Sequence, residues 1–143
     1  MKLLLYTLIL FLSSITSVIA SDKEFSKLED RCEIEFHAMS GWVTDDLSPA
    51  LKNREFSEFS QLLDSINSHM TKLKKCAMEI ARKSATRGIA RDDRYYIAHD
   101  HLVVAKVALE NNIKDPCTNN CFTLDTAEEW ANMAKETMRL GQP

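Results

Sequence analysis

An apolar residue recurs every three or four positions between residues 56 and 84, and this repeat restricts the fold more than any other feature of the chain. The steps alternate strictly between three and four, as in a seven-residue repeat. A helix with such a stripe lies along other helices at a shallow angle, so the repeat predicts a helical bundle. The stripe consists of Phe56, Phe59, Leu63, Ile66, Met70, Leu73, Ala77, Ile80 and Ser84.

The length of this helix suggests a break within it. Gly88 is expected to end the helix. At about 1.5 Å per residue, a helix over residues 54–87 would be roughly 50 Å long, more than a domain of this size needs. Residues 65–68 (Ser-Ile-Asn-Ser) are poor helix formers, and we therefore expect a bend or break there.

A first helix is predicted to precede this one. Ser21 and Glu24 have the spacing of a capping box, and Gly41 can close the C-terminus of the helix. Residues 42–53 are expected to form a connection, with a short helical turn starting at Ser48-Pro49. The inward positions of the first helix are Phe25, Leu28, Cys32, Phe36 and Met39.

Two more helices are predicted in the C-terminal half. Asp92-Asp93 can cap the third helix, which is expected to end at Asn111-Asn112. Thr123 or Asp125 can cap the fourth, which Gly141 would end. The inward positions are Tyr95, Ala98, Leu102, Ala105 and Leu109 in the third helix, and Ala127, Trp130, Ala134 and Met138 in the fourth.

These patterns predict an all-α fold, a disulfide-stapled four-helix bundle, or five helices if the long helix near 54–87 breaks around 65–68. The whole chain has only three glycines and three prolines, too few for the many turns of a sheet protein. Residues 21–143 are long enough for a single domain with a real core.

Residues 1–20 have the pattern of a cleavable signal peptide. Lys2 is followed by an almost wholly apolar run from Leu3 to Leu12, and Val18-Ile19-Ala20 resembles a signal peptidase site. The run is short for a membrane span, although a retained N-terminal anchor is the alternative. We therefore expect a periplasmic or secreted protein, with no transmembrane span after cleavage.

The four cysteines all follow the predicted signal peptide, which favours two disulfides. Cys117 and Cys121 are close enough in sequence to form a local loop. Residues 41–53 could span up to roughly 40 Å if extended. Such a long connection would allow the first helix to slide along the second until Cys32 meets Cys76. The predicted pairs are Cys32–Cys76 and Cys117–Cys121.

No motif predicts catalysis or a cofactor. The chain lacks the sequences typical of covalent haem, di-iron carboxylate and serine hydrolase sites, and His99 and His101 lie on different sides of a helix. A zinc site at Cys117 and Cys121 is chemically possible, but export favours oxidation. We expect no metal, no cofactor and no enzymatic activity.

The net charge of −3 argues against nucleic acid as a partner.

Charge is unevenly distributed along the chain. Residues 22–64 carry eleven acidic and five basic side chains, and residues 71–94 carry eight basic and three acidic ones. The basic run could dock an acidic partner, or it could lie against the acidic first helix and be neutralised by it. We favour neutralisation, because exposed charge runs are common. The basic candidates for partner binding are Lys72, Lys75, Arg82, Lys83, Arg87, Arg91 and Arg94.

Trp42 is a further candidate, because it is a large apolar residue in an expected connection. It could plug the end of the bundle, which we favour, or anchor a partner.

Three functions are compatible with the sequence. The first is an exported binding module that contacts another exported protein, for example an inhibitor, an immunity protein or an adaptor. The second is a carrier with a cavity for a small apolar ligand, and the third is an enzyme or cofactor protein with an unrecognised site. The sequence favours the first.

Overall fold

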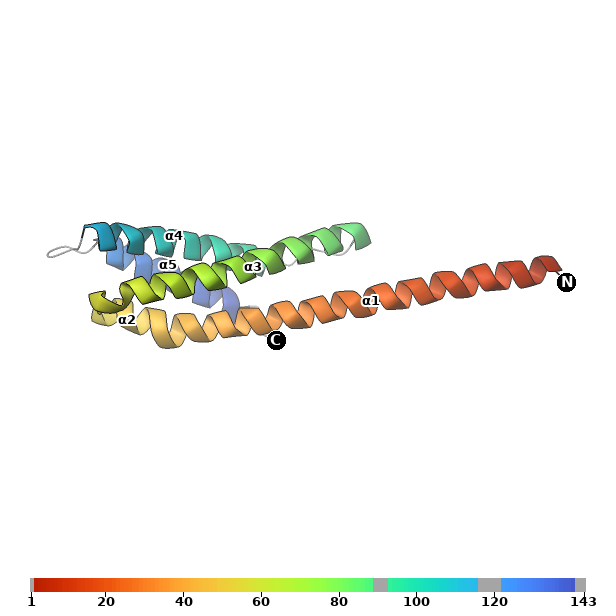
Figure 1. Ribbon diagram of the computed structural model, residues 1–143, viewed down its shortest axis with the longest axis horizontal. Helices are drawn as coiled ribbons and strands as arrows, with labels where there is room; N and C mark the ends of the chain where they lie inside the picture. Colours follow the sequence, from red (N-terminus) through yellow and green to blue (C-terminus); the bar gives the residue numbers. More distant parts are fainter. Residues whose placement is uncertain (1, 89–92, 116–121, 141–143) are drawn as a thin grey trace.

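The computed structural model describes residues 2–88, 93–115 and 122–140, with side chains from residue 22 onward except those of Phe56 and Phe122. Four long helices, α1, α3, α4 and α5, dominate the described residues (Figure 1). This confirms the all-α fold and the disulfide-stapled helical bundle. In chain order the elements are α1 (Lys2–Trp42), the π-helical η1 (Val43–Leu47), α2 (Ser48–Asn53), the 3-10 turn η2 (Phe56–Glu58), α3 (Phe59–Arg87), α4 (Arg94–Lys114) and α5 (Phe122–Leu140).

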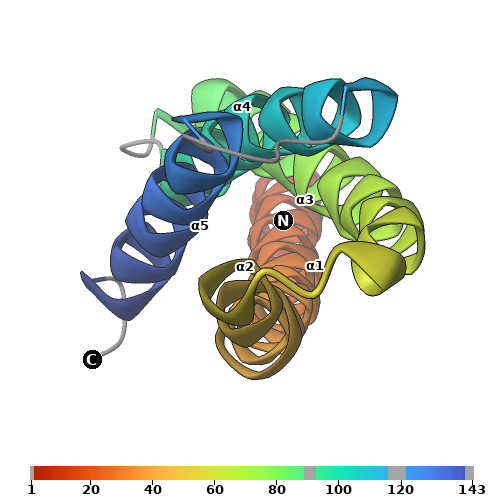
Figure 2. The ribbon, with the colours of Figure 1, turned by 90° about the vertical axis from the view of Figure 1, so that its left-hand side faces the viewer.

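The helices surround a common core. In the end view, α3, α4 and α5 curve around one side and α1 with α2 closes the other (Figure 2). The N-terminal half of α1 extends alone beyond the other helices (Figure 1). No helix in the described part of the chain is long and apolar enough to cross a membrane.

The predicted limits of the first helix are wrong at both ends. α1 begins at Lys2, not at Ser21, because the helical turns before Ser21 supply the carbonyl groups that a capping side chain would replace. At the other end, the backbone stays helical through Gly41 and on to Asn53. Residues 42–47 are therefore helical instead of forming a connection, whereas the short helix predicted to start at Ser48-Pro49 is present as α2. Val43, Leu47, Ala50 and Leu51 are buried, and their packing outweighs the low propensity of a single glycine.

The reversal of the chain between α2 and α3 occurs at Arg54. Its backbone adopts the left-handed conformation, with φ 56° and ψ 47°, and its amide donates to the carbonyls of Ala50 and Leu51. Arg54 lies midway in sequence between Cys32 and Cys76. A helical hairpin with its turn at Arg54 therefore brings these two cysteines level without any sliding of α1.

The disulfide Cys32–Cys76 joins α1 to α3, with the Cα atoms 5.5 Å apart. The predicted pairing of these two cysteines is confirmed. The other predicted pair, Cys117–Cys121, lies outside the described residues.

The predicted break of the long helix is wrong, since α3 runs unbroken from Phe59 to Arg87. Ile66 lies within the expected break and is fully buried, so its packing in the core outweighs the weak propensities of its neighbours. Gly88 ends α3 in the left-handed conformation, at φ 65°, as the sequence predicted.

The core contains most of the predicted inward residues. All five of the first helix and all five of the third are buried, as are Ala127, Ala134 and Met138 of α5. Trp130 is only half-buried, and α4 continues past Asn112 to Lys114. Asn112 is buried, with its Nδ2 3.5 Å from Oγ1 of Thr123, so this asparagine helps join α4 to α5 instead of ending α4.

Candidate partner-binding surface

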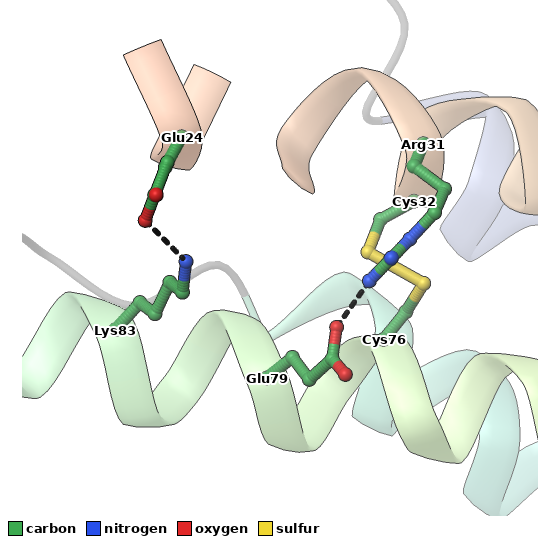
Figure 3. Close-up of polar contacts among 6 residues, drawn as sticks. All are labelled: Glu24, Arg31, Cys32, Cys76, Glu79 and Lys83. Carbon is green, nitrogen blue, oxygen red and sulfur yellow. Dashed lines mark hydrogen bonds and ion pairs between the residues drawn. A yellow bond between two sulfur atoms is a disulfide. The ribbon is translucent and has the colours of Figure 1, made fainter. Parts of the chain in front are cut away.

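A ladder of ion pairs between α1 and α3 neutralises three of the six basic residues of the run on α3. The two helices are antiparallel, so successive residues of α1 meet α3 in reverse order. Lys83 lies 3.8 Å from Glu24, and Arg31 pairs with Glu79 beside the Cys32–Cys76 disulfide (Figure 3). Arg87 pairs with Asp22, and Lys72 lies 3.5 Å from Glu35.

A cluster around Glu33 attaches the start of α4 to α1. The Tyr95 hydroxyl donates to Oε2 of Glu33 at 3.0 Å, and the Arg94 guanidinium lies 3.6 Å from the same oxygen. His37 lies 3.4 Å from the other oxygen of this carboxylate. Four of the basic candidates, Lys72, Lys83, Arg87 and Arg94, are thus in intramolecular ion pairs. The interpretation that acidic α1 neutralises the basic run is confirmed for these four residues.

The remaining described basic residues of the run surround a hollow on α3, which we call the α3 hollow. It has a volume of about 470 Å³ and is open to solvent. Lys74, Lys75 and Arg82 have no ion pair with any carboxylate in the described ranges. Glu79 also borders the hollow, but Arg31 neutralises it. The described lining residues are Thr71, Lys74, Lys75, Met78, Glu79 and Arg82.

An exposed methionine lies within this basic surface. Met78 is 56% exposed. Sequence reasoning selected Lys75 and Arg82 but missed Met78 and Lys74. The heptad stripe contained the signal, because Met78 follows Ala77 and so lies off the buried face of α3. An apolar residue at such an outward position is a candidate contact.

Trp42 is half-buried and packs against the core. Its ring centroid lies 5.6 Å from that of His69 on α3. Trp42 also borders a second open hollow of about 410 Å³, which we call the Trp42 hollow. The described lining residues of this hollow are Trp42, Asp45, Asp46, Pro49, Ala50, Asn53, Glu55, Glu58, Gln61, Leu62 and Ser65.

The packing of Trp42 leads to a stability prediction. Trp42→Ala is expected to lower the free energy of unfolding by about 2 kcal/mol, below the usual cost of a fully buried aromatic residue, because part of the ring is already in water. Chemical denaturation of the variant beside Trp42→Phe, which keeps a ring against His69, measures this effect. A Trp42→Ala variant as stable as the wild type would show that the ring does not close this side of the bundle.

His69 makes stability depend on pH near neutrality. Burial lowers the pKa of His69 below its ordinary value of 6.5, Lys72 lowers it further, and Glu35 raises it. Below pH 6.5 the unfolded chain therefore binds a proton at this residue more readily than the folded chain. The contribution of neutral His69 to stability is complete above pH 6.5 and is lost as the pH falls towards the lower pKa of the folded state.

Comparing the wild type with His69→Gln tests this dependence. When the pH is lowered from about 7.5 to about 5.5, the wild type should lose more stability than the variant, because glutamine does not titrate. Parallel stability curves for the two proteins would contradict the prediction.

Arg91, Cys117 and Cys121 lie outside the described residues, so the structure does not place them. Among the described side chains, no group of three or more histidines, cysteines or acidic residues has the geometry to hold a metal ion.

Comparison with protein families, with curated proteins and with solved structures finds no match to this chain.

Proposed function

We propose that this chain is a small exported binding module that acts by contact with another exported protein. The observation that carries the proposal is the α3 hollow, where Met78 lies exposed among cations that have no ion-pair partner in the described residues. Apolar anchors within a charged rim are typical of energetically important contact points at protein interfaces. The hollow is open to solvent, which suits surface contact better than enclosure of a small ligand.

The charge of the hollow indicates an acidic partner. Lys74, Lys75 and Arg82 would attract a negatively charged surface, accelerate its association and orient it. The partner would then cover Met78. Because Lys72, Lys83, Arg87 and Arg94 are already paired with carboxylates, the α3 hollow is the part of the basic run that supports contact with a partner.

Site-specific crosslinking tests this proposal. A photoreactive amino acid at position 78, introduced in the producing cell, should yield a discrete crosslinked species. A probe at Met133 on α5, which is 39% exposed, is the control and should not yield that species. The product should disappear in the variant Lys74→Glu/Lys75→Glu and persist in Lys114→Glu/Lys135→Glu, which changes the net charge equally on other helices. Equal crosslinking from both probes, or indifference to the first charge reversal, would contradict the proposal.

Export is a separate part of the proposal. We expect the mature chain to begin at Ser21 and to contain no free thiol, in agreement with the pattern of residues 1–20 and with the Cys32–Cys76 disulfide. Intact-mass measurement before and after treatment with an alkylating agent checks both expectations. A mass that still includes residues 1–20 would favour the retained N-terminal anchor, and alkylation of the native protein would contradict complete oxidation.

A further inference from the structure

The α3 hollow and the Trp42 hollow are complementary in charge. The first is bordered by Lys74, Lys75 and Arg82, whose charges are not neutralised by the described residues. The second is bordered by four exposed carboxylates with no basic residue among its described lining residues. These carboxylates, none of which has an ion pair in the described ranges, are those of Asp45, Asp46, Glu55 and Glu58.

The apolar parts of the two hollows also match. Met78 is the exposed apolar side chain of the α3 hollow, while Trp42, Pro49 and Leu62 contribute apolar surface to the Trp42 hollow. A methionine sulfur makes favourable contact with an aromatic ring at about 5 Å, and the flexible side chain adapts to irregular hollows. The volume of about 410 Å³ can therefore receive the end of a methionine side chain together with the ends of neighbouring lysines.

The two hollows of one molecule cannot reach each other. Leu62 borders the Trp42 hollow and Met78 the α3 hollow, and both lie on the unbroken helix α3. Their separation in sequence corresponds to about 24 Å along the helix axis and about 160° around it. The hollows therefore face different directions, so contact between them requires two molecules.

We propose that the acidic partner of the α3 hollow is a second copy of this chain, which docks through its Trp42 hollow. This inference rests on the proposed function, because it names the occupant of the same surface. Met78 of one molecule lies against Trp42 of the next, and lysines of the first face aspartates of the second. Since different surfaces of the two molecules meet, the association is head-to-tail and leaves a free hollow at each end for further copies.

Self-association of the purified, oxidised protein tests the inference. Light scattering coupled to size-exclusion chromatography should show a mass that rises with protein concentration at low ionic strength. The mass should fall towards that of the monomer at about 1 M salt, where the screening length is only about 3 Å. Wild-type protein that stays monomeric at every concentration and at low salt would overturn the inference.

Paired charge reversals identify the two surfaces. Lys74→Glu/Lys75→Glu makes both hollows acidic, and Asp45→Lys/Asp46→Lys leaves the Trp42 hollow without net negative charge, so each variant alone should be monomeric. Mixing the two variants should restore association, because the unchanged Trp42 hollow of the first variant then meets the unchanged α3 hollow of the second. The control variants Lys114→Glu/Lys135→Glu and Glu128→Lys/Glu129→Lys should associate like the wild type. Association that survives either test reversal, or that mixing does not restore, would overturn the inference.

The crosslinking experiment at position 78 separates this inference from the proposed function. A crosslinked dimer of this chain supports the inference, and it supports the proposed function only in so far as the α3 hollow is a contact surface. If the product contains a different protein and the purified chain is monomeric, the inference fails and the binding module stands. If no product forms and the chain is monomeric, both fail.

Discussion

Replacing both Cys32 and Cys76 by alanine is expected to lower the free energy of unfolding by about 4 kcal/mol. The disulfide links residues 44 positions apart, and closing a loop of that length removes much of the conformational entropy of the unfolded chain. Cys32 is fully buried and Cys76 is 4% exposed, so alanine fits at both positions without exposing a polar group. Because the crosslink also joins α1 to α3, its loss should loosen the ladder of ion pairs beside it.

Chemical denaturation with and without a reducing agent measures this effect. The reduced wild type should be destabilised to about the level of the reduced double variant, whereas the variant, which keeps only the predicted Cys117–Cys121 pair, should respond less to reductant. The dependence of the unfolding free energy on denaturant should become steeper without the crosslink, since the unfolded chain then exposes more surface. A loss below about 1 kcal/mol would contradict the assignment of this disulfide as the main constraint on the unfolded chain.

The antiparallel register of α1 and α3 could be predicted from the sequence, but for a partly incorrect reason. Pairing Cys32 with Cys76 was a correct prediction, and so was the expectation that acidic α1 lies against the basic run, as the Lys72–Glu35 pair shows. Apart from the short helix at Ser48-Pro49, the helical conformation of residues 42–53 was missed, because β-branched residues, paired aspartates and a proline concealed a continuing buried stripe. Met39, Val43 and Leu47 are spaced four apart, and this spacing was the signal that the helix continues.

Local propensity gave the wrong answer where tertiary packing dominates. Ser65, Asn67 and Ser68 are weak helix formers, yet α3 does not break at them. Ile66 lies among them and is fully buried, and its burial stabilises the helix by more than the propensities cost. Propensity is therefore a poor guide to breaks inside a helix whose apolar stripe is continuous.

The candidate site was only partly predictable. Sequence showed where the basic charge concentrates, but the pairing of each cation depends on which α1 residue lies opposite. Lys72 and Lys75 are three residues apart, yet only Lys72 faces Glu35, while Lys75 borders the α3 hollow. Met78 could be identified as a candidate contact only once the exposed face of α3 was known. The Trp42 hollow could be identified only once the fold of residues 42–65 was known.

Phe36 links α1 to the start of α4 and is the second place where a single change should have a large effect. The side chain is fully buried, and its ring meets the ring of Tyr95 edge-on, with centroids 5.2 Å apart and an interplanar angle of 78°. The Arg94 guanidinium lies 5.3 Å from the centroid of the same ring and also pairs with Glu33. Packing of Phe36 thus holds Tyr95 and Arg94 in position to contact Glu33.

Phe36→Ala is therefore expected to lower the free energy of unfolding by about 4 kcal/mol, in the range found for buried phenylalanines, because it leaves a cavity between α1 and α4. Tyr95→Phe, which keeps the aromatic contact but removes the hydrogen bond to Glu33, should cost only about 1 kcal/mol.

Ile34→Ala is the matched control on α1. Its side chain is 69% exposed, and its removal should change stability by less than about 0.5 kcal/mol. Chemical denaturation of the three variants beside the wild type measures the series. A cost for Phe36→Ala no greater than that for Ile34→Ala would show that α1 does not pack on the start of α4.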